Sequence, residues 1–290
     1  MWSAPLQLFQ KHYKVRAVSY QFRTRPKTLN DTLGRTLGKL RAGITYLLNR
    51  KGPLSVPVNQ VGGFVRSGGH VQQPDIQLYF NPISYAVSAT GKTLLDRVSG
   101  YQISAQPCRP TSRGQIEIKS ADPNESPQIM PNSLSTAADQ DNALAACKIL
   151  QDYAKTDSLR AVTINAKAPD LCAMDDAALL HDFRARASTV FHPACTCRMG
   201  RSPQDSVLDE RLRVHDVSRL RVVDASAFPN ITSGNTNAPT MMLAMRAADL
   251  ILEDAESVGV DTPNGIKCAN VEVDFVRNPV IWPPILLHRA

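Results

Sequence analysis

The sequence has little clustered positive charge for a chain with a formal net charge of +7. Its Lys and Arg residues are spread along 290 residues and are interrupted by apolar ones. A groove that follows a nucleic-acid backbone needs grouped cations with aromatic side chains between them. The scattered charge therefore predicts no nucleic-acid partner.

Cysteines and long apolar runs are also scarce. Six cysteines in a chain of this length are too few for a disulfide scaffold and favour a reducing compartment. No stretch approaches the roughly 20 apolar residues of a membrane span. Lys11, His12 and Lys14 precede any run that suits a signal peptide. We expect no membrane span and a cytoplasmic protein.

A third absence is the pattern G-x-G-x-x-G, which occurs nowhere in the chain. In dinucleotide-binding domains this glycine-rich turn joins a strand to a helix whose backbone amides hold the pyrophosphate. The chain therefore lacks a segment that predicts such a turn.

The apolar pattern that is present predicts an α+β fold, with an antiparallel sheet flanked by helices. Alternation typical of half-buried strands occurs at residues 76–80, 101–105 and 115–118. Helical spacing of apolar residues occurs at 29–48, 137–153, 177–187 and 238–252. A short strand is expected at 220–224. Residues 255–290 contain four prolines and no periodicity, which predicts an irregular tail.

Several sequence blocks stand in a fixed order in the second half of the chain. They are FHPACTCRMG at 191–200, VLDERLRVH at 207–215, LRVVDAS at 220–226 and SGNTNAPT at 233–240, preceded by YLLNRKGPL at 46–54 and GGF at 62–64. Together they resemble the C-terminal signature of the glucose-methanol-choline (GMC) oxidoreductases, over roughly residues 10–253. The resemblance implies FAD as cofactor and a small-molecule alcohol as substrate.

The resemblance also implies roles for single residues. His192 matches the catalytic position, where a neutral imidazole takes the hydroxyl proton while hydride passes to flavin N5. Asn235 matches the second catalytic residue, whose amide orients the substrate oxygen. The implied cofactor contacts are Asp224, Ala225, Asn237 and Pro239. On local grounds alone, Asp224 is equally typical of a residue that caps a turn.

The same resemblance divides the chain into four parts. Residues 1–20 are expected to be a remnant of a Rossmann-like flavin-binding domain, whose leftover strand and helix pieces lie at 1–20 and about 190–254, and residues 21–189 a substrate-binding domain. Residues 190–254 would complete the flavin-binding domain and carry the active site, and the tail follows from 255.

Because the glycine-rich turn is absent, two hypotheses about function stand. The chain is active when a separate N-terminal half-chain complements it, or it is a non-catalytic remnant or interaction module.

One position departs from the family pattern. The family usually has glycine where this chain has Cys195, so a backbone with positive φ at that position would carry strain here. The cysteine also raises a metal-site alternative with His192 and Cys197. Their spacing is poor for zinc, and we expect no metal.

His215 is the alternative catalytic base, but its charged surroundings favour a solvent-facing position.

Overall fold

The computed structural model describes residues 16–87 and 93–257. The chain divides into two compact units, Met1–Ala244 and Met245–Ala290, and helix α6 (Asn237–Ser257) contains the boundary between them. No helix in the described part of the chain has the length and apolar content needed to cross a bilayer. The tail expected at 255–290 and the remnant expected at 1–20 lie almost entirely outside the described residues.

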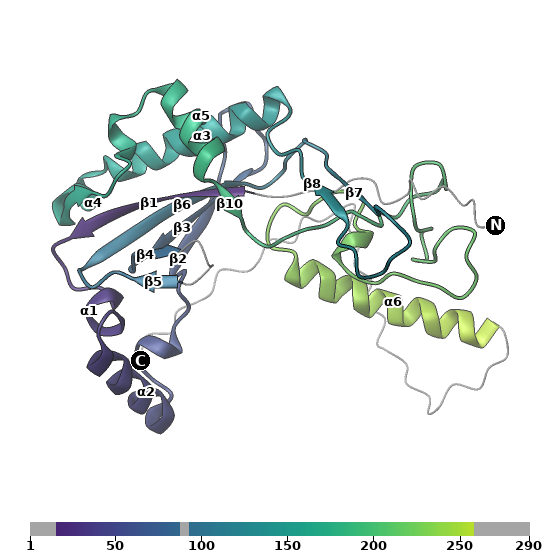
Figure 1. Cartoon of the computed structure of the whole chain (residues 1–290), viewed down its shortest axis with the longest axis horizontal. Helices are drawn as coiled ribbons and strands as arrows, with labels where there is room; N and C mark the ends of the chain where they lie inside the picture. The colour runs from purple at the N-terminus through teal and green to yellow at the C-terminus, as the bar shows by residue number, and fades with distance from the viewer. Residues whose placement is uncertain (1–15, 88–92, 258–290) are drawn as a thin grey trace. The chain divides into compact units, whose positions relative to one another are not determined.

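A six-stranded antiparallel sheet is the main feature of the first unit (Figure 1). The strand order is β10 (Ser188–Thr189), β1 (Arg16–Thr24), β6 (Gly100–Pro107), β3 (Ile76–Asn81), β2 (Val61–Val65), and β9 (Thr163–Ala166) also pairs with β1. The antiparallel sheet is thus confirmed. The expected domain boundary at residue 20 falls inside β1, and the four-part division stays a prediction.

Helices cover one face of this sheet (Figure 1). They are α3 (Ala137–Ala154), α4 (Asp157–Val162) and α5 (Asp176–Arg186). In β1 the alternate residues Val18, Tyr20 and Phe22 are buried, and they share one apolar core with Leu150 of α3 and Phe183 of α5. The helices expected at 137–153 and 177–187 therefore lie where the sequence placed them, with N-caps whose side chains accept backbone N–H groups.

The single helix expected at 29–48 is wrong, because two helices occupy this range. They are α1 (Leu29–Leu33) and α2 (Thr36–Asn49), and Arg35 between them has extended backbone. The chain turns tightly at Gly34, where an added Cβ would lie 2.5 Å from the Asp96 carbonyl oxygen. The short 3-10 helix η2 (Pro53–Ser55) follows α2.

The strands expected at 115–118 and 220–224 also differ. β7 (Gln115–Glu117) pairs with β8 (Gln128–Met130) in a separate two-stranded sheet, as β4 (Tyr85–Val87) does with β5 (Thr93–Leu95). Residues 220–224 form no strand, and Arg221 makes one isolated bridge with Arg213. The segment pairs with residues 212–214 only through this bridge and the hydrogen bonds beside it, and it leads into the 3-10 helix η4 (Ala225–Ala227). Another 3-10 helix, η3 (Leu171–Ala173), lies before α5.

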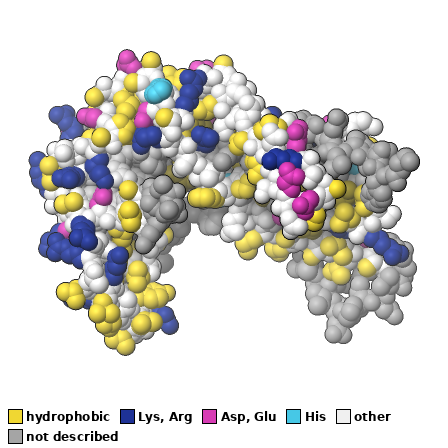
Figure 2. All heavy atoms as spheres, viewed as in Figure 1, with side chains coloured by type: hydrophobic (Ala, Val, Ile, Leu, Met, Phe, Trp, Pro, Cys, Tyr) yellow, Lys and Arg dark blue, Asp and Glu magenta, His cyan; other side chains and the backbone are white. Residues whose placement is uncertain are grey.

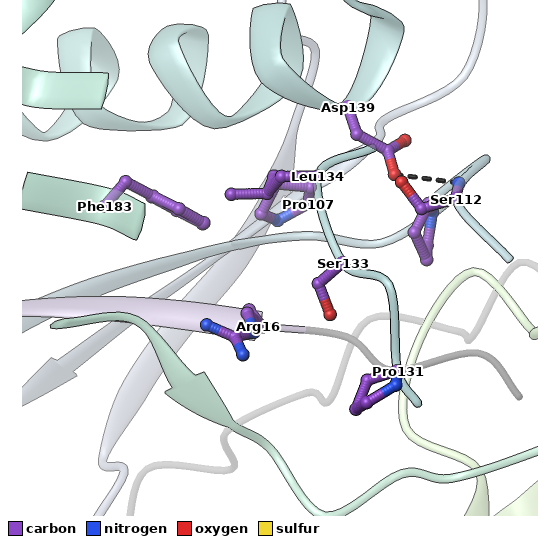
Figure 3. Close-up of a pocket in the computed structure, with 9 residues that line it drawn as sticks. Arg16, Pro107, Ser112, Pro131, Ser133, Leu134, Asp139 and Phe183 are labelled. Carbon is purple, nitrogen blue, oxygen red and sulfur yellow. Dashed lines mark hydrogen bonds between the residues drawn. The ribbon is translucent and has the colours of Figure 1, made fainter. Parts of the chain in front are cut away.

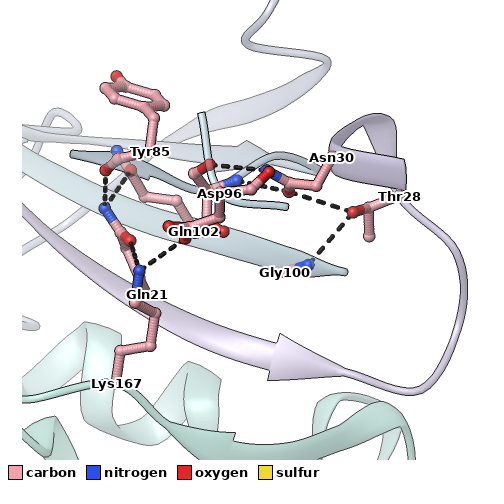
Figure 4. A network of polar contacts seen from close by, with 9 residues as sticks. Gln21, Thr28, Asn30, Tyr85, Asp96, Gly100, Gln102 and Lys167 are labelled. Atoms are coloured by element: carbon pink, nitrogen blue, oxygen red, sulfur yellow. Dashed lines mark hydrogen bonds and ion pairs between the residues drawn. The ribbon is translucent and has the colours of Figure 1, made fainter. Parts of the chain in front are cut away.

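A polar network attaches α1 to the sheet (Figure 4). The buried Asn30 amide donates to the carbonyl oxygens of Ser84 (2.7 Å) and Asp96 (3.0 Å), and its Oδ1 accepts the Ser84 N–H. Lys167 Nζ lies 2.6 Å from the Asp96 carboxylate and 3.0 Å from Gln21 Oε1. Burial acts to raise the pKa of Asp96, but the hydrogen bonds from Lys167 and Ser84 outweigh it and lower that pKa. The network fixes the point from which α2 departs.

A buried carboxylate, that of Asp139, lies in the first turn of α3. It accepts the N–H groups of Thr111 (2.6 Å) and Ser112 (2.9 Å), beside a pocket of about 30 Å³ that Arg16 and Ser133 also line (Figure 3). Burial acts to raise the pKa of Asp139, yet the hydrogen bonds from Ser112 and Thr111 hold it below its ordinary value. Asp139 therefore joins α3 to the loop that follows β6.

Replacing Asp139 by asparagine tests this junction. A carboxyl group whose pKa is lower in the folded state than in the unfolded state stabilises the protein at pH values above its unfolded-state pKa of about 3.9. That stabilisation is lost as the pH falls through the folded-state pKa. Asp139→Asn should cost about 1–3 kcal/mol at pH 7, with the gap to the parent narrowing below about pH 4. Thermal unfolding from pH 3 to 7 measures it, with the exposed Asp141→Asn of the same helix as control. An equal gap at all pH values would contradict a role for the charge.

Candidate active site

The chain turns sharply between β10 and His192. Phe191 has left-handed backbone, with φ 61°, and its N–H donates to Thr189 Oγ1 at 3.1 Å. The Phe191 side chain is exposed and His192 is half-buried. The chain leaves the sheet at this turn, so His192 lies in the loop that follows β10.

Three backbone hydrogen bonds fix the segment after His192. The N–H groups of Cys195, Cys197 and Met199 donate to the carbonyl oxygens of residues 225, 226 and 227, at 3.1, 2.9 and 2.9 Å. These acceptors are the three residues of η4. The segment 195–199 of the FHPACTCRMG block and residues 225–227, which end the LRVVDAS block and follow it, are therefore held against each other by their main chains.

Cys195 sits at the strained position that the sequence suggested. Its φ is 72°, in the left-handed region, and its side chain is fully buried with Ala194, Phe228 and Ile231 in a small apolar cluster. A residue with a Cβ pays about 1–2 kcal/mol in this conformation. The burial of the thiol in the cluster offsets part of that strain.

The imidazole of His192 has two partners. Its Nε2 lies 3.2 Å from Asn235 Oδ1, and its Nδ1 lies 3.0 Å from Thr236 Oγ1. In this arrangement Nε2–H donates to the amide oxygen and the threonine hydroxyl donates to Nδ1. The structure thus brings the two sequence-derived catalytic residues together and adds a third, Thr236, whose side chain is buried.

Asn235 and Thr236 directly precede α6. The Thr236 carbonyl oxygen accepts the N–H of Thr240 at 3.0 Å, so Thr236 is the residue from which the helix begins. Asn237 and Pro239 occupy the first turn, where proline is well tolerated. The first N–H groups of a helix have no partner within it and carry partial positive charge. His192 is therefore next to a site that favours developing negative charge.

The Asp224 side chain caps η4. Its Oδ1 accepts the Ser226 N–H at 2.7 Å, and the residue is exposed. This is the turn-capping role that the sequence alone left open, and the second carboxylate oxygen remains for other contacts. Ala225 is half-buried against the apolar cluster that contains Cys195.

Two residues beyond the expected site contact the loop before α6. Arg109 Nε donates to Ser233 Oγ at 2.9 Å, and the Phe64 ring of β2 lies against Gly234, where an added Cβ would be 3.5 Å from its Cζ. Phe64 belongs to the GGF block, so the sequence carried a signal for it. Thr236 lies inside SGNTNAPT, whereas nothing local marked Arg109.

The structure also describes the residues of the two alternative assignments, which are a metal site at Cys195 and Cys197 and a catalytic base at His215. Burial raises the pKa of Cys195 to about 12 and also raises that of Cys197, so both thiols are protonated near neutral pH. No group of three or more His, Cys, Asp or Glu side chains suits a metal within the described ranges. His215 is half-buried, not fully solvent-facing, with Nε2 3.0 Å from Ser206 Oγ.

Residues 110–244 match the family model of the GMC oxidoreductases. The chain belongs to the GMC oxidoreductase family, whose members use FAD.

Two relatives illustrate the sequence similarity. The chain is 36% identical to an alcohol dehydrogenase [acceptor] of Pseudomonas putida over 80% of its own length and 41% of the relative's. It is 36% identical to the mitochondrial choline dehydrogenase of Homo sapiens, over 79% of this chain and 38% of that protein. The chain thus spans about two fifths of the length of these relatives.

Solved structures share the fold. A formate oxidase superposes with a TM-score of 0.75 at 20% identity, covering 85% of this chain and 47% of that one. A fungal aryl-alcohol oxidase gives a TM-score of 0.70 at 19% identity, over 87% of this chain and 49% of the other.

The left-handed backbone at Cys195 predicts an inverted preference between alanine and glycine. Cys195→Gly should be more stable than Cys195→Ala by about 1 kcal/mol, because glycine adopts positive φ freely. Cys147, buried inside α3, is the matched control, where alanine should exceed glycine by about 1 kcal/mol. Chemical unfolding of the four variants measures both differences. The same order at both positions would show that Cys195 is not strained.

Proposed function

We propose that this chain forms the part of a FAD-dependent oxidoreductase that binds an alcohol and removes its hydroxyl proton. The contact between His192, Asn235 and Thr236 at the start of α6 carries the proposal. When bound, FAD supplies the acceptor for the hydride that leaves the alcohol carbon. The product is the corresponding carbonyl compound.

The residues near His192 suit one side of a flavin. Asn237 and Pro239 belong to the first turn of α6, whose unpaired N–H groups favour an electron-rich ring or a phosphate. Asp224 keeps one carboxylate oxygen outside its cap and is exposed, as a contact to a ribityl hydroxyl requires. The chain offers no glycine-rich turn for the pyrophosphate, so the fit covers the ring side of the cofactor.

Proton removal requires an unprotonated Nε2 on His192. In the Nδ1–H tautomer the Thr236 hydroxyl accepts from Nδ1, and in the other tautomer it donates, so the same contact serves both. Rotation of the Asn235 amide then presents Nδ2–H toward the substrate oxygen. The positive end of α6 stabilises the negative charge that develops on that oxygen as its proton departs.

Different parts of the chain would have different roles. We assign substrate binding to residues 21–189 and the active-site part of the flavin-binding domain to 190–254, with 1–20 as a remnant of that domain. The contacts from Arg109 and Phe64 to the 233–234 loop support a substrate space bordered by both parts. A separate or fused N-terminal half would supply the missing pyrophosphate turn.

A fusion tests the requirement for that half. The part of the Pseudomonas putida relative that this chain does not match would be joined ahead of it. The 290-residue chain alone should purify colourless, whereas the fusion should carry flavin absorbance and be bleached by an alcohol under anaerobic conditions. A yellow preparation of the chain alone would contradict the division of the cofactor site. A folded, flavin-loaded fusion that no alcohol bleaches would favour a non-catalytic module.

Substitutions in the flavin-loaded fusion test the catalytic assignment. His192→Ala should slow flavin reduction by about 100- to 10,000-fold, the contribution of a positioned general base. Asn235→Ala should cost less, about 2- to 10-fold, since a neutral hydrogen bond is worth about 0.5–1.5 kcal/mol. Stopped-flow absorbance measures both rates, and His215→Ala is the matched control. If His215→Ala abolished reduction and His192→Ala did not, the base would be His215.

Thr236 is a positioning residue, and its test needs a readout that fold stability does not move. Thr236→Val should lower the reduction rate about 5- to 10-fold. The KM for the alcohol should stay near that of the parent, because Thr236 contacts His192 and not the substrate. Thr236→Ser should restore the rate. A valine variant that reduces flavin as fast as the parent would mean that the hydroxyl does not act on His192.

A further inference from the structure

Helix α2 turns its apolar side away from the protein. Its small residues face inward: Ala42 is buried, and an added Cβ at Gly38 would collide with the Thr32 carbonyl oxygen of the preceding segment. The opposite side exposes large aliphatic side chains at helical spacing. They are Leu37, Leu40, Ile44, Leu47 and Leu48, and we call them the α2 stripe.

The α2 stripe is unusually exposed for side chains of this size. Leu37, Leu47 and Leu48 are 81%, 71% and 76% accessible. Exposed aliphatic side chains continue beyond the helix, at Leu54, Val56, Val58 and Val61. Figure 2 shows hydrophobic side chains gathered at the end of the view where Figure 1 draws α2. A contiguous apolar patch of this kind marks a surface that binds something.

The charge around the stripe has one sign. Between Asp31 and Asp75 the sequence contains no Asp or Glu. The same interval contains Arg35, Lys39, Arg41, Arg50, Lys51 and Arg66. At 100° per residue, Lys39 and Arg41 lie on either side of the stripe. Two carboxylates of the neighbouring polar network are already engaged, Asp31 with Ser99 and Asp96 with Lys167.

We propose that α2 and the segment after it bind the surface of an anionic lipid bilayer, with the stripe among the acyl chains and the flanking cations at the headgroups. This surface is independent of the proposed oxidation. An amphipathic helix with a basic polar border lies in the plane of such an interface. At 14 residues, α2 is about 21 Å long, suited to lying on a bilayer and too short to cross one.

The chemistry of the surface favours lipid over the other occupants. Nucleic-acid phosphates would engage the cations but leave five aliphatic side chains in water. The buried centre of a protein interface is typically rich in aromatic residues, whereas the stripe consists of Leu and Ile alone. An anionic bilayer satisfies the apolar and the basic parts together.

Vesicle flotation of the 290-residue chain tests the proposal. The chain should float with phosphatidylcholine vesicles containing 30% phosphatidylserine, and much less with phosphatidylcholine alone. Leu40→Gln with Leu47→Gln should lower the partition coefficient at least about tenfold, and Arg41→Gln about fivefold. Ile129→Gln and Ile164→Gln, at exposed aliphatic positions outside the stripe, should leave it unchanged. Raising the salt concentration should release the chain.

Two further measurements keep the result interpretable. Circular dichroism should be the same for parent and variants, because glutamine is a good helix former at exposed positions. Leu47→Trp should give blue-shifted emission on anionic vesicles relative to the parent. No flotation with either vesicle, or no difference between them, would overturn the proposal. So would a dimer that Leu40→Gln with Leu47→Gln dissociates without vesicle binding, since the stripe would then pair two copies of the chain.

Discussion

The position of the segment that follows His192 depends on main-chain hydrogen bonds. Three N–H groups after His192 donate to three successive carbonyl oxygens of η4. To make the first of these bonds, Cys195 adopts left-handed backbone, so the strain at that residue and the position of the imidazole have one cause. Side chains in both segments can vary as long as this pairing survives.

Thr236 connects that framework to the chemistry. Its carbonyl oxygen accepts the first hydrogen bond of α6, and its hydroxyl contacts His192. Two oxygen atoms of one residue therefore set the helix direction and the imidazole orientation. A helix whose N-terminus shifted would also move the hydroxyl away from Nδ1. In the proposed mechanism, the proton acceptor and the electrostatic stabilisation of the substrate oxygen are therefore coupled through a single residue.

Regular elements with strong periodicity could be predicted from the sequence, and elements defined by tertiary contact could not. Strands β3 and β6 and helices α3, α5 and α6 follow from alternation, helical spacing and caps. The break between α1 and α2 depends on the buried amide of Asn30 and the close approach at Gly34, which no local pattern shows. The pairing of His192 with Asn235 was implied by family resemblance. The contact with Thr236, 44 residues away, required the fold.

The cysteine thiols of the described residues differ in burial, so their reactivity can report which part of the chain unfolds first. Cys108, Cys147 and Cys195 are buried with raised pKa values, whereas Cys172 is exposed. An alkylating reagent reacts with accessible thiolate, so in the native state it should modify Cys172 before the other cysteines of the described ranges. Cys147 lies in the sheet-and-helix core and Cys195 in the cluster beside His192. Their order of modification under mild denaturant would therefore reveal whether the segment that follows His192 opens before the sheet does.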